Sequence, residues 1–125
     1  MTNNEVKSIM EAYSAMREAK SDTKIPVRAA WIRRKNLKKI AEAYATYREA
    51  FAELQQRYSD DEHSVLHENG DRQIRMQYMP QYQSEVSELL SLDAGVTVEK
   101  IKLEDLGECN LSDSEMDTLA FMIEE

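Results

Sequence analysis

The chain has 125 residues, enough for one domain with a modest hydrophobic core. It is 42% hydrophobic and 32% charged, with three glycines and two prolines, which indicates a globular chain made mostly of regular structure. It has no run of about 20 apolar residues, so the sequence predicts no membrane span, and its N-terminus lacks the features of a secretory signal.

Charge is divided unevenly along the chain. Residues 1–48 carry 11 Lys and Arg against 5 Asp and Glu, a net charge of +6, whereas residues 49–125 carry 5 against 19, a net charge of −14. Three interpretations stay open: a basic half that binds a polyanion, head-to-tail contact between copies, and a solvated surface that keeps the protein soluble. The single cysteine, Cys109, cannot form an internal disulfide, which suits the reducing cytoplasm.

The first half of the chain predicts two helices. Residues 3–19 form the first, which Asn3 or Asn4 can cap. After a short polar turn, a long second helix is expected from Pro26 to Tyr58, because no further glycine or proline interrupts it. The short connection predicts antiparallel neighbours, and about 33 helical residues would span roughly 50 Å.

Apolar residues of the long helix repeat every seven positions. One line comprises Ala30, Leu37, Tyr44, Phe51 and Tyr58, and its companion comprises Ile40, Tyr47 and Leu54. This pattern is typical of a helix that packs on other helices. The first helix and the segments after Tyr78 can pack against these two lines of residues. We therefore expect the lines to form part of the core within one molecule.

The second half predicts shorter elements. A polar loop closes with the turn Asn69-Gly70, and residues 73–78 then alternate apolar and polar as a short strand does. A helix over 80–92 and a second alternating segment over 96–103 follow. The two strands are expected to pair, through a crossover or as an antiparallel pair, and the sequence leaves that choice open.

A capping box that begins at Ser112 predicts a last short helix. Together these elements predict an α+β, mainly helical fold: an antiparallel helical hairpin with a long second helix, a small two-stranded element and short C-terminal helices. The chain is expected to be a single domain over 1–125. The hairpin would occupy 3–59, and a small α+β part over 72–125 would pack on its distal end.

The densest positive charge lies on the first half of the long helix. At helical spacing Arg28, Lys35 and Lys39 share a side, as do Arg34 and Lys38. On a helix these side chains can follow phosphates, while Trp31 adds a stacking surface. The alternative is a solvated face whose Arg and Lys stems cover apolar residues. We expect folding to leave this face unexplained. The candidate interaction surface consists of Arg28, Arg33, Arg34, Lys35, Lys38 and Lys39.

Negative charge is concentrated towards the C-terminus. Carboxylates spaced along a surface can occupy a phosphate-binding groove and so imitate DNA towards a basic partner. The alternative is ordinary solubilising charge. The candidate acidic surface consists of Glu104, Asp105, Glu108, Asp113 and Asp117.

No pattern predicts catalysis, and we expect the protein not to be an enzyme. His63 and His67 lie four residues apart among carboxylates, a spacing that can bind zinc or nickel on a helix. However, the segment is predicted as an exposed polar loop. The chain has no Gly-rich phosphate loop, no GxSxG and no CxxC pair. The sequence therefore predicts no catalytic residue, no cofactor and no metal site.

Soft motifs along about residues 3–123 carry a resemblance to a known family. They include Ile25-Pro26-Val27-Arg28-Ala29-Ala30, Lys35-Asn36-Leu37, Tyr47-Arg48, Tyr58, Asn69-Gly70, Glu88-Leu89-Leu90, Val96-x-Val98, Ile101-x-Leu103-x-x-Leu106 and Leu119-x-Phe121-Met122-Ile123. With these motifs the chain resembles small phage and prophage proteins of unknown function from Gram-positive bacteria. The resemblance implies a phage origin and supplies no activity, ligand or functional residue.

The sequence-based hypothesis is a non-enzymatic phage or prophage protein in the cytoplasm of a bacterial host, acting without a membrane or cofactor. It would bind a protein partner, either a host factor or a virion assembly component. One alternative is a nucleic-acid binder that uses the basic helix face 28–39. Another is an acidic, DNA-mimic-type inhibitor of a host defence protein. Self-association through the charge-split surfaces also stays open.

Overall fold

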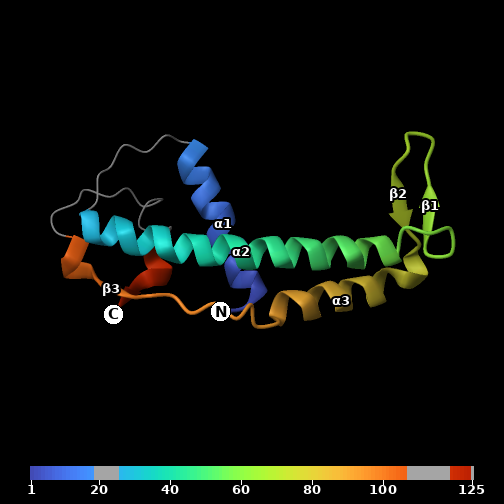
Figure 1. The fold of residues 1–125 in the computed structure, drawn as a ribbon. Helices are drawn as coiled ribbons and strands as arrows, with labels where there is room; N and C mark the ends of the chain where they lie inside the picture. Colours follow the sequence, from blue (N-terminus) through green and yellow to red (C-terminus); the bar gives the residue numbers. More distant parts are fainter. Residues whose placement is uncertain (19–25, 107–118, 125) are drawn as a thin grey trace.

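The computed structural model describes residues 1–18, 26–106 and 119–124. Within them the α-helices are α1 (Asn3–Glu18), α2 (Val27–Arg57) and α3 (Met79–Ser91). The predicted class, α+β and mainly helical with a long second helix, is confirmed. Figure 1 shows the other elements arranged along α2. In the described part of the chain, no helix combines the length and the apolarity needed to cross a membrane.

Helix α2 runs unbroken for 31 residues, about 46 Å at 1.5 Å per residue. The predicted line of Ile40, Tyr47 and Leu54 is buried, whereas most of the companion line that starts at Ala30 is only half-buried. In the N-terminal turns of α2, the buried positions are instead Ala29 and Asn36, each one residue before Ala30 and Leu37 of the companion line. The buried residues of α2 are Ala29, Ile32, Asn36, Ile40, Tyr47 and Leu54.

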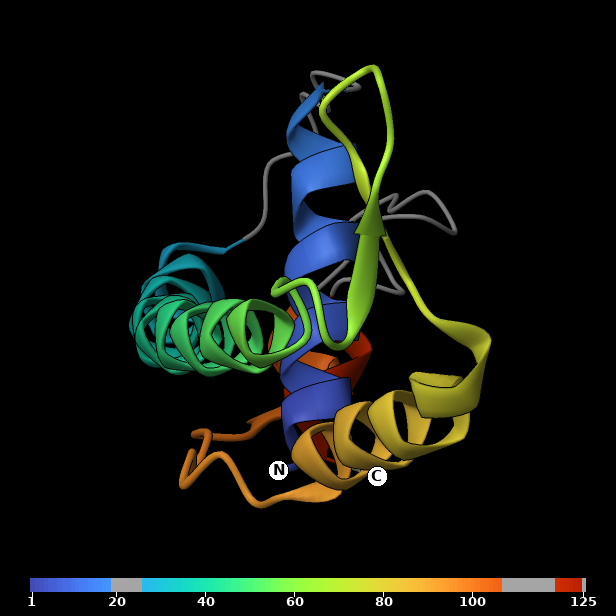
Figure 2. The ribbon, with the colours of Figure 1, turned by 90° about the vertical axis from the view of Figure 1, so that its right-hand side faces the viewer.

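Helix α1 packs against α2, so the two consecutive helices of the predicted hairpin contact each other. The arms cross steeply: Figure 1 shows α1 passing the middle of α2, and Figure 2, which looks nearly along α2, shows α1 running across it. A crossing covers only a few turns of a helix. The two ends of α2 are therefore left to other elements.

Thr2 caps helix α1, and the prediction of Asn3 or Asn4 as the cap is wrong. The backbone N–H of Glu5 donates to Thr2 Oγ1 at 3.2 Å, and the Thr2 N–H donates to Glu5 Oε1 at 3.1 Å, which is a capping box. Asn3 is used elsewhere, because its side-chain amide donates to the Leu89 carbonyl at 2.8 Å. The start of α1 is thereby fastened to the end of α3.

Helix α3 confirms the helix predicted over 80–92 and lies beside the C-terminal half of α2 (Figures 1 and 2). Near its start the rings of Tyr58 and Tyr82 meet edge to face, with centroids 5.3 Å apart. Near its end the backbone N–H of Asn3 donates to the Leu92 carbonyl at 3.0 Å. Helix α3 therefore bridges the distal end of α2 and the N-terminus.

Strands β1 (Ser64–Leu66) and β2 (Arg72–Ile74) form an antiparallel hairpin at the distal end of α2 (Figure 1). Gly70 of the predicted turn has a φ of 89°, which glycine adopts without steric cost. The strand predicted over 73–78 ends early, since Met76–Tyr78 is a 3₁₀ turn (η1). Its partner is β1 and not the later strand, because the turn returns the chain directly.

Strand β3 (Ile101–Lys102) pairs in parallel with β4 (Ile123–Glu124). Both predicted pairings of segment 96–103 with the earlier strand are therefore wrong. Residues 96–100 of that segment belong to no strand, and Leu103–Leu106 is a 3₁₀ turn (η2). A two-residue strand is too short to dominate the packing, so side chains must hold this region.

A buried cluster joins the N-terminal end of α2 to the last described segments of the chain. Around Ala29 and Ile32 it gathers Ile101, Leu106, Leu119 and Met122. Of the predicted part over 72–125, the elements β2, η1 and α3 therefore lie at the distal end, whereas the segments that contain Ile101, Leu106, Leu119 and Met122 pack at the N-terminal end of α2 (Figure 1). Of the predicted last helix, residues 112–118 lie outside the described residues. The chain then continues as the 3₁₀ turn Ala120–Met122 (η3) and β4.

Asn36 is the fully buried polar side chain at the centre of this end. Its Nδ2 donates to the Glu99 carbonyl at 2.9 Å, and its Oδ1 accepts the Glu99 N–H at 2.9 Å. The same Nδ2 lies 3.8 Å from Met122 Sδ. One side chain thus pairs with both backbone groups of one residue, as a neighbouring strand would, and holds the extended segment against α2.

Replacing Asn36 by leucine is expected to lower the free energy of unfolding by about 2 kcal/mol, because two backbone groups of Glu99 lose their partner. Urea denaturation followed by circular dichroism measures the loss. Lys38→Leu, on an exposed position of the same helix, is the matched control and should change stability by less than about 0.5 kcal/mol. Equal stability of Asn36→Leu and wild type would contradict the role given to Asn36.

Candidate interaction surface

The first turns of α2 carry the predicted basic surface, and the structure divides its six residues. Lys35 and Lys39 contact the segment over 97–99. The other four, Arg28, Arg33, Arg34 and Lys38, make no ion pair or hydrogen bond through their side chains within the part of the chain that the structure describes. The surface is thus partly structural and partly open.

Lys35 and Lys39 help to hold the extended segment. Lys35 Nζ lies 2.7 Å from Glu99 Oε2, and Lys39 Nζ donates to the Thr97 carbonyl at 3.5 Å. Lys35 lies one residue before Asn36 and Lys39 lies three residues after it, so both lysines lie on one side of α2 next to Asn36. The expectation that folding leaves the whole basic face unexplained is therefore wrong for these two residues.

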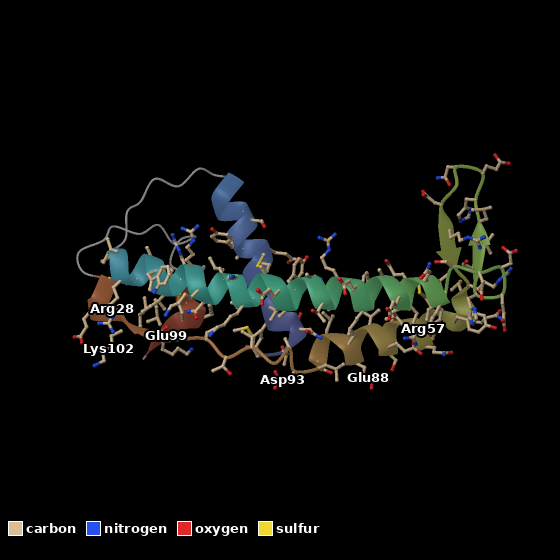
Figure 3. All side chains as sticks on the ribbon, in the orientation of Figure 1. Arg28, Arg57, Glu88, Asp93, Glu99 and Lys102 are labelled. Carbon is tan, nitrogen blue, oxygen red and sulfur yellow. The ribbon has the colours of Figure 1, made fainter. Side chains whose placement is uncertain are left out.

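The carboxyl group of Glu99 is set in a positive environment. Its pKa is lowered first by the hydrogen bond from Lys35, then by the Lys35 charge, with partial burial acting in the opposite direction. Arg28 and Lys39 add smaller charge effects that also lower the pKa. Figure 3 places Arg28 and Glu99 at the same N-terminal end of α2, with Lys102 close by.

The charge at the N-terminal end of α2 runs against the helix dipole. The N-terminus of a helix carries partial positive charge and favours acidic residues, and the C-terminus favours basic ones. The first turn of α2 has no acidic residue and contains Arg28, whereas Arg57 in the last turn suits the dipole. Helix stability therefore does not account for the positive charge at the start of α2.

Four exposed side chains follow one line on the outward side of α2: Val27, Trp31, Arg34 and Lys38, which we call the open stripe. Val27 is 87% exposed and Trp31 is 59% exposed. Lys35 Nζ lies 5.8 Å from the centroid of the Trp31 ring, within cation–π range. Sequence reasoning missed Val27, although its place one turn before Trp31 on the same line was a usable signal.

The candidate acidic surface is only partly within the structure. Glu104 is exposed in η2, and Asp105 belongs to the same turn. Glu108, Asp113 and Asp117 lie outside the described residues, as does Cys109. Of this predicted surface, the described residues therefore include Glu104 and Asp105 only.

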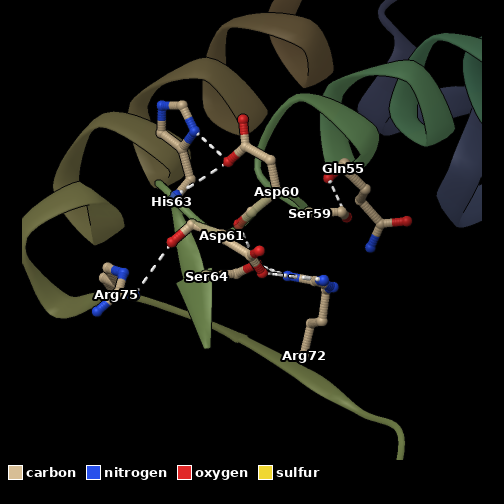
Figure 4. A network of polar contacts seen from close by, with 8 residues as sticks. All are labelled: Gln55, Ser59, Asp60, Asp61, His63, Ser64, Arg72 and Arg75. Atoms are coloured by element: carbon tan, nitrogen blue, oxygen red, sulfur yellow. Dashed lines mark hydrogen bonds and ion pairs between the residues drawn. The ribbon is translucent and has the colours of Figure 1, made fainter. Parts of the chain in front are cut away.

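A polar network closes the distal end of α2 (Figure 4). Asp60 Oδ1 accepts the His63 N–H at 3.0 Å and lies 2.6 Å from His63 Nδ1. These bonds lower the pKa of the Asp60 carboxyl. Arg72 lies 3.2 Å from Asp61 Oδ1, and Arg75 donates to the Asp61 carbonyl at 3.0 Å. The loop after α2 is thus tied to β2.

The two histidines do not converge on one site. His63 packs against Tyr78, with ring centroids 4.6 Å apart, whereas His67 Nε2 lies 3.0 Å from Gln73 Oε1 in the hairpin. In the described residues, one group has its potential ligand atoms within 4.8 Å of one another: Asp60, Glu62 and His63. Since His63 Nδ1 already bonds Asp60, the polar network explains this grouping.

A groove of about 620 Å³ lies beside Lys39, between the middle of α2 and the loop that follows α3. Its lining includes Lys39, Glu42, Thr46, Tyr47 and Asp93 and contains neither histidine nor cysteine. Two of these polar side chains bond the backbone, since Thr46 Oγ1 donates to the Glu42 carbonyl at 3.2 Å and Lys39 Nζ donates to the Thr97 carbonyl at 3.5 Å. We therefore place the candidate site on the open stripe and not in this groove.

Comparisons of the chain with protein-family models, with curated proteins and with solved structures found no match. The functional argument therefore depends on the chain's own residues.

Acid is expected to remove the stabilising effect of the Lys35–Glu99 ion pair. Because the folded-state pKa of Glu99 is depressed, the contribution is present above the unfolded pKa of about 4.3 and is lost as pH falls through the folded value. Urea denaturation of wild type and Lys35→Met at pH 7 and at about pH 3 measures this. Wild type should be the more stable at pH 7 only. A difference that does not change with pH would contradict the ion pair's role.

Proposed function

We propose that this protein is not an enzyme and acts by binding a protein partner that presents an acidic surface to the open stripe. The observation that carries the proposal is Trp31, which is 59% exposed between cationic side chains. Large aromatic side chains are usually buried when they serve only the fold. Trp and Arg are also the residues most enriched among those that dominate binding energy.

The composition of the open stripe suits a protein interface. Val27 and Trp31 offer apolar area at its start, and Arg34 and Lys38 continue it with charge. Interfaces commonly have such an apolar centre with a polar rim. Arg34 and Lys38, which have no ion-pair partner among the described residues, favour an acidic surface, because complementary charge accelerates encounter and excludes partners of the wrong sign.

The resemblance to phage and prophage proteins suggests where the partner is found. We propose that the protein acts in the cytoplasm of a bacterial host, where a host factor or a virion assembly component would be the partner. The acidic character of the partner rests on the stripe alone.

Nucleic acid is the second candidate ligand, because an exposed Trp31 among cations also suits base stacking and phosphate contacts. Two observations make it weaker. Lys35 and Lys39 are engaged with the segment over 97–99, which leaves fewer cations to follow a phosphate backbone. The net charge of −8 also opposes approach to a polyanion.

Affinity capture from a lysate of a Gram-positive bacterium, with and without nuclease, tests the proposal. Wild type is compared with R34E/K38E, with Trp31→Ala and with the control R48E/R57E, which makes the same charge change at exposed positions of the same helix. Since Trp31 is largely exposed, its replacement should leave the fold intact.

A specific protein should be retained by wild type and by R48E/R57E, and reduced at least about tenfold by the two stripe variants. Nuclease should have no effect. Equal capture by all four proteins would overturn the proposal, and loss of capture after nuclease would favour the nucleic-acid alternative.

A further inference from the structure

The tip of the molecule formed by residues 59–76 has exposed apolar side chains that the fold does not use. The β1–β2 hairpin stands out from the distal end of α2 (Figures 1 and 2). Val65 is 41% exposed and Leu66 is 57% exposed, and Met76, just after β2, is 86% exposed. An isolated two-stranded hairpin is only marginally stable without cover. The tip therefore has the character of a surface that meets another molecule.

The tip is also acidic. Residues 59–76 contain five Asp and Glu and two Arg, a net charge of −3. Asp60 and Asp61 have partners in the polar network of Figure 4. Glu62 and Glu68 are exposed and make no ion pair within the described ranges of the chain. Negative charge is thus available at this end.

The opposite end of α2 has the complementary charge. Residues 26–40 contain six Lys and Arg and no Asp or Glu, a net charge of +6. The open stripe lies there with its exposed Val27 and Trp31. Each end of the long helix therefore combines exposed apolar side chains with charge, and the signs of the charges are opposite.

These two surfaces cannot satisfy each other within one molecule. Helix α2 holds them apart by its 31 residues, about 46 Å. Charges on a protein surface are screened within about 8 Å at physiological salt. Attraction between the ends can therefore stabilise a contact only between different molecules.

We propose that the occupant of the open stripe includes a second copy of this chain, whose acidic hairpin tip docks on Val27, Trp31, Arg34 and Lys38. The contact joins different surfaces of the two copies, so it can extend into a head-to-tail chain or close into a ring. Charge sets the orientation, and the exposed apolar side chains at both ends supply the area that is buried. This deepens the proposed function and rests on it, since both use the open stripe.

Sedimentation velocity at about 50 mM and about 500 mM salt tests the contact with purified protein alone. Four proteins are compared: wild type, the stripe variant R34E/K38E, the tip variant E62K/E68K and the control E49K/E88K. The control makes the same charge change as the tip variant at exposed positions on α2 and α3. Circular dichroism verifies that each variant is folded.

Wild type and the control should associate at low salt with increasing concentration and dissociate at high salt. Each of the other variants should weaken association at least about tenfold, and a 1:1 mixture of the two should restore it, because their reversed charges are complementary. A wild type that stays monomeric at low salt would overturn the proposal. So would association that survives in both variants, or a mixture that does not recover.

The self-association test and the partner-capture test can fail independently of each other. The tip variant leaves the open stripe unchanged, so partner capture should persist when self-association is lost. If wild type is monomeric but stripe-dependent capture is observed, the self-contact fails and the proposed function stands. If neither is observed, both fail.

Discussion

The arrangement of this protein depends on one buried amide. Asn36 occupies a core position of α2, between Ile32 and Ile40, where an aliphatic residue would be expected. Its two hydrogen bonds to the backbone of Glu99 fix the extended segment that leads into β3. Because β3 and β4 are only two residues each, the sheet alone cannot set the register of this region. The amide therefore positions the segment from which Ile101 and Leu106 enter the cluster around Ala29 and Ile32.

This constraint also divides the basic surface. Lys35, Asn36 and Lys39 face the segment over 97–99 and serve the fold, whereas Val27, Trp31, Arg34 and Lys38 face outward. The proposed binding function rests on this outward surface, whose exposed apolar side chains and basic first turn are not accounted for by the described contacts of the fold. The length of α2 also matters for the distribution of charge. It separates the basic open stripe from the acidic hairpin tip by several screening lengths, so these two surfaces do not neutralise each other within one molecule.

Patterns within single elements were sufficient to predict much of this fold. The long helix, the helix over 80–92 and the turn at Gly70 follow from unbroken helix formers, apolar spacing and turn chemistry. Pairings between distant segments could not be predicted, because β3 and β4 are too short to carry a sequence signal. The burial of Asn36 was not predicted because the residue is polar. Its position four residues from both Ile32 and Ile40, on the same side of the helix, could have indicated it. The basic residues were predicted as a group, but only the position of Glu99 separates structural lysines from the open stripe.

The central claim, that the Asn36 side chain acts as a strand partner for the segment over 96–100, is tested most directly by amide hydrogen exchange measured by NMR. The Glu99 N–H donates to Asn36, whereas the described residues give the N–H groups of Val96 and Val98 no hydrogen bond. The account predicts that the Glu99 amide exchanges at least about tenfold more slowly than those two neighbours. Exchange of Glu99 at the same rate as Val96 and Val98 would contradict it.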